Sequence, residues 1–434
     1  MPLIAAPAES EEGSLGLIHG VALYVGAVLG TGILVLPAIA AATAGPASVL
    51  AWVALVVLSV PLALTYAALA RQRPDAAGFA GAIERAFGRE WGGVAGWIFL
   101  AQTPTGFVVA ALIAGGSAAG AFGGGRDAAF LGGAALVLLA FGLNLVGLRV
   151  SATAQAVAVG IIALVIFVVI ARAMPEVDPS AFSPFFPNGP AAVGVAAVQL
   201  FWAFVGWEAI TPLAGEFRDR RDIWRASFLA VLVVGAFYVS LSVVTVGTRA
   251  YGESVVASAP LVSLATRSFG PSAGWIVGLG GFVLSFPVVN AYVAGITRLA
   301  AALARRRQLP GWLGELGPAG VPRRAILVLF SLAAIALAVA YLVRLGIADL
   351  LPLSTSSFIA TYVLSMAAAV RLLRPPLRYA AASAFVACGL VLLLTGALLG
   401  WIAAVSLAAL AYMRLSGRDY RIRKPPANGS SGAT

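Results

Sequence analysis

Long apolar runs alternate with short polar connections along almost the whole chain. An apolar helix of ~20 residues crosses the ~30 Å hydrocarbon core of a membrane. The pattern therefore predicts an all-α polytopic membrane protein with twelve transmembrane spans, between polar tails at 1–16 and 416–434. The expected spans are 17–43, 46–70, 92–121, 128–148, 152–173, 192–217, 223–248, 273–304, 325–345, 349–371, 379–396 and 399–415. The stretch 252–271 is too polar to cross and is expected to be a surface helix or loop.

The basic residues lie mainly on one side of these spans. The few expected on the opposite side are Arg126, Arg172, Arg249, Arg267 and Arg344. Short cytoplasmic loops are enriched in Lys and Arg, so both termini are predicted to be cytoplasmic. We expect the protein in the inner (plasma) membrane of a bacterium.

The composition excludes several classes of protein. With 61% hydrophobic and 10% charged residues, the chain does not have the composition of a soluble domain. The net charge of +11 does not indicate nucleic-acid binding, because the basic residues flank the spans. One cysteine, Cys388, and one histidine, His19, leave no internal disulfide and no metal cluster. A membrane enzyme is therefore disfavoured, and no cofactor is expected.

The first span is interrupted at its centre. Gly30, Thr31 and Gly32 stand in the middle of the apolar run, and Pro37 follows. Glycine leaves a helix at little cost and proline removes a backbone donor. Backbone groups freed at mid-membrane must be buried in protein or line a polar cavity, and the start of the second half-helix favours an anion. The alternative is a close packing face of small residues.

The sixth span carries a second interruption of the same kind. Gly206 lies at mid-membrane, Pro212 follows, and Glu208 is the acidic residue placed nearest the bilayer centre. A charged side chain there costs ~2.5–3.5 kcal/mol on insertion scales, so it is a functional candidate. The alternative is a protonated Glu208 that bonds a freed backbone group and has no part in turnover.

The two interruptions occupy equivalent positions in two blocks of five spans, 17–173 and 192–371. Since five is odd, the second block begins on the opposite side of the membrane from the first. This arrangement predicts an inverted-repeat transporter whose site lies at the midplane. Residues 379–415 are then a peripheral pair of helices.

Three motifs resemble the amino acid–polyamine–organocation (APC) superfamily. They are Gly30-Thr31-Gly32-Ile33 with Pro37, Phe201-Trp202-Ala203-Phe204-Val205-Gly206-Trp207-Glu208, and Ser285 to Arg305 in the eighth span. The resemblance covers the chain except its tails and is strongest to bacterial exporters of methionine and branched-chain amino acids. It implies a LeuT-type fold of ten core and two peripheral helices.

The resemblance also implies where an amino acid binds. Its carboxylate would meet Thr31 and the nearby amides, its ammonium would meet carbonyls at the two breaks, and Trp202 would be an aromatic lid. The residues expected to bind substrate are Val28, Gly30, Thr31, Gly32, Trp202, Val205 and Gly206. Polar residues elsewhere in the spans are weaker candidates: Gln102, Thr103, Thr105, Asn144, Gln155 and Ser354 to Ser357.

The coupling ion is left open. Some proton-coupled relatives place a lysine in the fifth helix, yet residues 152–171 contain neither Lys nor Arg. Ser285 and Asn290, with carbonyls of the first span, would suit sodium, and Glu208 would suit a proton. An uncoupled exchanger is the third possibility.

The preferred hypothesis is a secondary active transporter of neutral amino acids. Tyr24, Ala27, Phe204, Val205 and Trp207 surround the breaks and favour an apolar side chain, with methionine, leucine, isoleucine and valine leading. The alternatives are an exchanger or importer of basic amino acids or polyamines, a channel, and a sensor without flux. We expect a monomer or homodimer in the lipid bilayer. Its expected substrate is an amino acid, and we expect no nucleic-acid partner.

Overall fold

The computed structural model describes residues 16–72, 78–147, 152–208, 217–252, 260–317 and 320–423. In these ranges the chain is helical and forms no strand, as the predicted all-α class requires. A helix satisfies the hydrogen bonds of its own backbone groups, whereas the hydrocarbon of a membrane offers those groups no hydrogen-bond partners.

Most helices coincide with predicted spans, but the span 92–121 is divided at Gln102, and a helix outside the predicted spans lies at Gly78–Phe87. The α-helices are α1 (Leu17–Leu29), α2 (Leu36–Ala44), α3 (Ser48–Gln72), α4 (Gly78–Phe87), α5 (Arg89–Ala101), α6 (Thr103–Ala121), α7 (Arg126–Val146), α8 (Ala152–Ala173), α9 (Ala191–Leu200), α10 (Arg220–Gly247), α12 (Pro260–Phe269), α13 (Pro271–Arg305), α14 (Arg323–Leu342), α15 (Ile347–Leu372), α16 (Leu377–Leu393) and α17 (Leu398–Arg423). Short 3₁₀ turns, η1 (Gly32–Leu34), η2 (Gly45–Ala47) and η5 (Phe201–Phe204), adjoin α2, α3 and α9. The polar stretch before α13 contains the surface helix α12, and its residues 253–259 lie outside the described part.

Within the described ranges, nine helical segments are long and apolar enough to cross a membrane. Three shorter apolar helices are Leu17–Leu29, Ala191–Phe204 and Leu377–Leu393. A crossing by any of these three needs a contribution from the adjoining chain, since ~20 helical residues are required. The predicted total of twelve spans therefore stays a prediction.

The outer surface of the bundle is apolar. Large hydrophobic side chains are exposed along helices at its edge, among them Leu131, Leu138, Leu332, Ile335 and Leu390. Large exposed hydrophobic side chains in such number are unusual for a soluble protein. It is the surface that lipid tails would cover.

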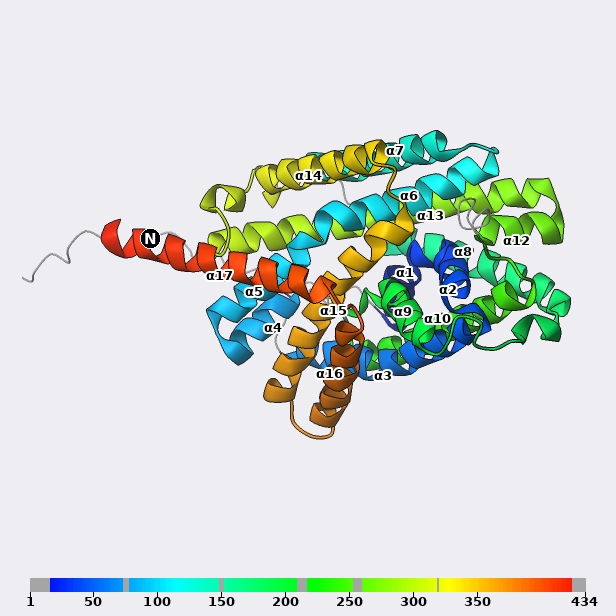
Figure 1. Cartoon of the computed structure of the whole chain (residues 1–434). Helices are drawn as coiled ribbons and strands as arrows, with labels where there is room; N and C mark the ends of the chain where they lie inside the picture. The colour runs from blue at the N-terminus through cyan, green and yellow to red at the C-terminus, as the bar shows by residue number, and fades with distance from the viewer. Residues whose placement is uncertain are drawn as a thin grey trace, which may run out of the picture.

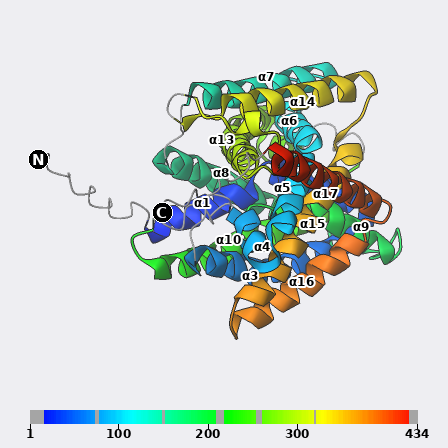
Figure 2. The same ribbon diagram turned by 90° about the vertical axis from the view of Figure 1, so that its left-hand side faces the viewer.

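The broken helices lie inside the bundle. Figure 1 shows α2 and α9 side by side, above α3, and both views place α7 against α14 at one edge (Figure 2). Glycines let α6 and α7 approach closely, because a Cβ at Gly115 would lie 2.0 Å from the carbonyl oxygen of Ala129. This packing fixes the outer helices around the breaks.

The predicted orientation can be tested by cysteine labelling. With Cys388 replaced by alanine, we expect a cysteine at Gly125 to react with an impermeant maleimide in intact cells. A cysteine at Gly311 should react only after the cells are opened. Both glycines are exposed, and a Cβ added at either would meet no atom within 4 Å in the described part of the chain. Labelling of Gly311→Cys, and not Gly125→Cys, from outside would reverse the assigned orientation.

Candidate functional site

The first predicted break is present and is centred on Gly30. Helix α1 ends at Leu29, and Gly30 has a φ of 34°, which favours glycine. The 3₁₀ turn η1 begins at Gly32, and α2 begins at Leu36. The first amides of a helix have no carbonyl ahead of them in that helix. The amides around Thr31 and Gly32 therefore lie where an anion would be stabilised.

The second predicted break directly contacts the first. After η5 the chain is extended at Val205, and Gly206 has a φ of 131°. A Cβ at Gly206 would lie 2.9 Å from the carbonyl oxygen of Ala27, which is closer than a Cβ normally comes. Only glycine therefore lets the two broken helices come together at this point.

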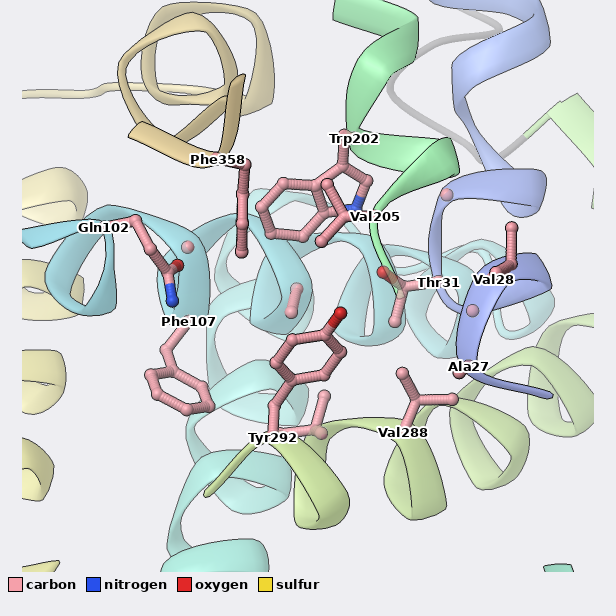
Figure 3. Close-up of a pocket in the computed structure, with 15 residues that line it drawn as sticks. Ala27, Val28, Thr31, Gln102, Phe107, Trp202, Val205, Val288, Tyr292 and Phe358 are labelled. Carbon is pink, nitrogen blue, oxygen red and sulfur yellow. The ribbon is translucent and has the colours of Figure 1, made fainter. Parts of the chain in front are cut away.

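A cavity opens between the two breaks and helices α6, α13 and α15. Its cavity volume is about 60 Å³, several times the ~10–15 Å³ that one water molecule needs. Its lining residues are Ala27, Val28, Gly30, Thr31, Gly32, Gln102, Gly106, Phe107, Ala110, Trp202, Val205, Val288, Val289, Tyr292 and Phe358 (Figure 3). None of these lining residues carries a charged side chain.

The cavity has two chemically different ends. Backbone of the two breaks, with the hydroxyl of Thr31, forms one end, and side chains of α6 and α15 form the other (Figure 3). Phe358 packs edge-on against Trp202, with ring centroids 5.8 Å apart, and lies 6.5 Å from the ring of Tyr292. A polar backbone end and an aromatic end together suit an amphipathic small molecule.

Six of the seven predicted substrate residues line this cavity, and the seventh, Gly206, contacts Ala27 beside it. The roles assigned to them stay predictions. Of the apolar residues expected around the substrate, Ala27 and Val205 line the cavity, whereas Tyr24, Phe204 and Trp207 are buried in the core. The aromatic end comes from residues that the sequence did not single out, Phe107 and Phe358, with Tyr292 from a quoted motif.

Glu208 lies behind the cavity in a hydrogen-bonded cluster. Its carboxylate accepts a hydrogen bond from the amide of Gly206 at 3.0 Å and another from the hydroxyl of Tyr362. The hydroxyl of Tyr292 lies 3.5 Å from the other carboxylate oxygen. Because Tyr292 also lines the cavity, one side chain connects the cavity with the buried carboxylate.

The side chains of the two residues predicted to hold sodium already form hydrogen bonds, one within its own helix and one with a neighbouring helix. Ser285 donates to the carbonyl of Gly281 in its own helix at 2.7 Å. The side-chain oxygen of Asn290 accepts from Asn144 of α7 at 2.7 Å. Neither lines the cavity. The weaker candidate Asn144 thus serves a contact between helices, and the side chain of Gln155 is outside the described part.

Tyr238 of α10 connects the two breaks and was missed in the sequence. Its hydroxyl lies 2.8 Å from the carbonyl oxygen of Val28, 3.0 Å from that of Ala203 and 3.4 Å from that of Leu29. Its ring packs on Trp52, with centroids 4.6 Å apart. The Val28 carbonyl, predicted to meet an ammonium, keeps a second lone pair for that purpose.

We expect Tyr238→Phe to destabilise the protein and weaken substrate binding. The change removes the shared donor and leaves buried carbonyls unsatisfied, at a cost of about 1–3 kcal/mol. The measurement is thermal unfolding of the purified protein in detergent, combined with the half-saturation concentration of substrate. Tyr412→Phe is the matched control, since no described residue hydrogen-bonds to that hydroxyl. Equal behaviour of the two variants would show that Tyr238 does not hold the breaks.

The chain is similar to known amino acid permeases over most of its length. The amino acid permease family profile matches residues 15–415. The uncharacterized amino acid permease YecA of Bacillus subtilis (strain 168) is 35% identical over 421 residues, covering 93% of this chain and 96% of YecA. The L-methionine/branched-chain amino acid exporter YjeH of Escherichia coli (strain K12) is 32% identical over 419 residues, covering 96% of this chain and 98% of YjeH.

Among solved structures, the chain is similar to MhsT in complex with L-phenylalanine. The TM-score is 0.62 at 14% sequence identity, over 89% of this chain and 100% of the other. At this identity the likeness concerns the fold alone. It confirms the predicted LeuT-type fold.

Proposed function

This chain belongs to the amino acid permease family, and we propose that it is a secondary active transporter of neutral amino acids that works by alternating access. The leading substrates are methionine, leucine, isoleucine and valine. Permeases move solutes rather than transform them, so the site is one for binding and release.

The observation that carries the proposal is the contact between the two helix breaks at one end of the cavity. Broken helices offer amides at the start of one half and free carbonyls at the end of another. A carboxylate suits the first set and an ammonium the second. An amino acid zwitterion supplies both charges at the required short separation.

The other end of the cavity favours an uncharged side chain. Phe107, Ala110 and Phe358 line it, and no described lining residue is charged. Burial of a Leu- or Met-sized side chain in such surroundings contributes ~1.5–3 kcal/mol. A cationic or acidic side chain would lose its hydration without gaining an ion partner. The relative YjeH is named as a methionine and branched-chain exporter, and we propose export as the direction here.

Glu208 is the proposed carrier of a coupling proton. It is buried, it bonds the amide of Gly206 in the second break, and it approaches Tyr292 of the cavity. Gain or loss of a proton would change how many hydrogen bonds this carboxyl accepts. Sodium coupling through Ser285 and Asn290 is less favoured, because both already bond within or between helices.

Competition for binding tests the substrate class. Labelled leucine or methionine should be displaced by leucine, methionine, isoleucine and valine. Their methyl esters and decarboxylated amines should fail, because the polar end of the cavity needs both charges. Arginine should fail for lack of an ion partner. Strong competition by arginine or the amines, with none from leucine or methionine, would favour the alternative of a basic amino acid or polyamine exchanger.

A further inference from the structure

One polar side chain stands at the otherwise apolar end of the cavity. Gln102 lies at the junction of α5 and α6, lines the cavity and is only 4% exposed. Figure 3 shows its amide above Phe107, on the side of the cavity opposite Thr31. A substrate bound by its charged groups at Thr31 would therefore point its side chain towards Gln102.

The position of this amide is fixed by its neighbours. The hydroxyl of Ser354 on α15 lies 3.4 Å from Oε1 of Gln102. A Cβ on Gly106, one turn along α6, would lie 2.1 Å from the same Oε1. The absence of a side chain at Gly106 thus makes room for the amide, and Ser354 holds its oxygen.

The nitrogen of this amide, unlike its oxygen, has no hydrogen-bond partner among the described residues. No described residue accepts a hydrogen bond from Nε2 of Gln102, although an amide nitrogen has two hydrogens to donate. A wholly aliphatic side chain that fills this end of the cavity would exclude water and leave those donors unpaired. A substrate side chain with a hydrogen-bond acceptor at the depth of Gln102 would pair with one of those donors.

We infer that Gln102 sets side-chain specificity, and that it favours substrates with a hydrogen-bond acceptor near the δ position over aliphatic ones of equal size. This inference rests on the proposed function. A thioether sulfur is a weak acceptor and an ether oxygen a stronger one. Methionine is therefore preferred to norleucine, which has the same length and a methylene in place of the sulfur.

The test measures the competition constants of methionine, norleucine and O-methylhomoserine, the ether analogue of methionine. In the unmodified protein, methionine should compete roughly three- to tenfold better than norleucine, which is the effect of one hydrogen bond. In Gln102→Met, which keeps the length and removes the amide, that preference should disappear. In the same variant, O-methylhomoserine should lose at least as much of its competitive advantage over norleucine as methionine loses.

Thr105→Val is the matched control, because Thr105 lies on the same turn and does not line the cavity. Its preference for methionine should remain within about twofold of that of the unmodified protein. A methionine-to-norleucine ratio that Gln102→Met leaves unchanged would overturn the inference while leaving the proposed function intact. If Gln102→Met does not fold, equal competition by the three ligands in the unmodified protein overturns it. Failure of all three ligands would instead contradict the proposed function.

Discussion

Replacement of Gly206 by alanine is expected to abolish amino acid binding, while the protein still inserts into the membrane. Gly206 has a φ of 131°, where an L-residue is strained by about 1–3 kcal/mol. The added Cβ would also lie 2.9 Å from the carbonyl oxygen of Ala27 and 3.0 Å from its carbon. The backbones of the two breaks would have to separate, so we expect affinity to fall by ~100-fold or more.

Gly252→Ala is the matched control for this change. Gly252 has a φ of 126°, and a Cβ there would meet no atom of a described residue within 4 Å. The control therefore introduces similar backbone strain without a contact between the breaks. Membrane yield and binding of labelled leucine or methionine are measured for both variants. Normal affinity in Gly206→Ala would show that the contact between the breaks is not needed for the site.

Glu208→Gln is expected to abolish the dependence of transport on a pH gradient, while exchange of one amino acid for another persists. Glutamine keeps the size of the side chain and one acceptor oxygen, so the bond from the Gly206 amide can remain. The glutamine amide does not gain or lose a proton near neutral pH. Transport driven by a pH gradient should fall to the level seen without one, and exchange should stay within about threefold.

Uptake into proteoliposomes, with and without an imposed pH gradient, measures this effect. Glu176→Gln is the control, because Glu176 is exposed and pairs with Arg172 at 3.0 Å, outside the cluster around Glu208. It should behave like the unmodified protein. If the gradient drives Glu208→Gln as strongly as the unmodified protein, the carboxyl has a structural role and the coupling ion must be sought elsewhere.

The breaks and the family were predictable because they leave local signals in the sequence. Glycines and a following proline inside an apolar run have few explanations at mid-membrane depth. The motifs around Thr31 and Glu208 carry the family resemblance, which the family profile and relatives confirm. The span boundaries were predicted from length and hydrophobicity alone.

The rest of the site depends on which helices meet, and that leaves no local signal. Tyr238, Phe107 and Phe358 are ordinary residues of apolar helices until packing brings them to the breaks. Gly206 was predicted as a helix breaker, but its contact with Ala27 joins segments distant in sequence. A polar residue such as Gln102 is a weak signal, because most polar side chains in membrane helices bond neighbouring helices.

Counterflow in proteoliposomes tests the central claim most directly. Vesicles that contain the purified protein are loaded with unlabelled methionine or leucine and diluted into a trace of the labelled amino acid. Alternating access at one site predicts saturable uptake of label that transiently exceeds equilibrium and requires the internal amino acid. A sensor would give binding without uptake, and a channel would give uptake that neither saturates nor responds to the internal amino acid. Either of these results would contradict the account.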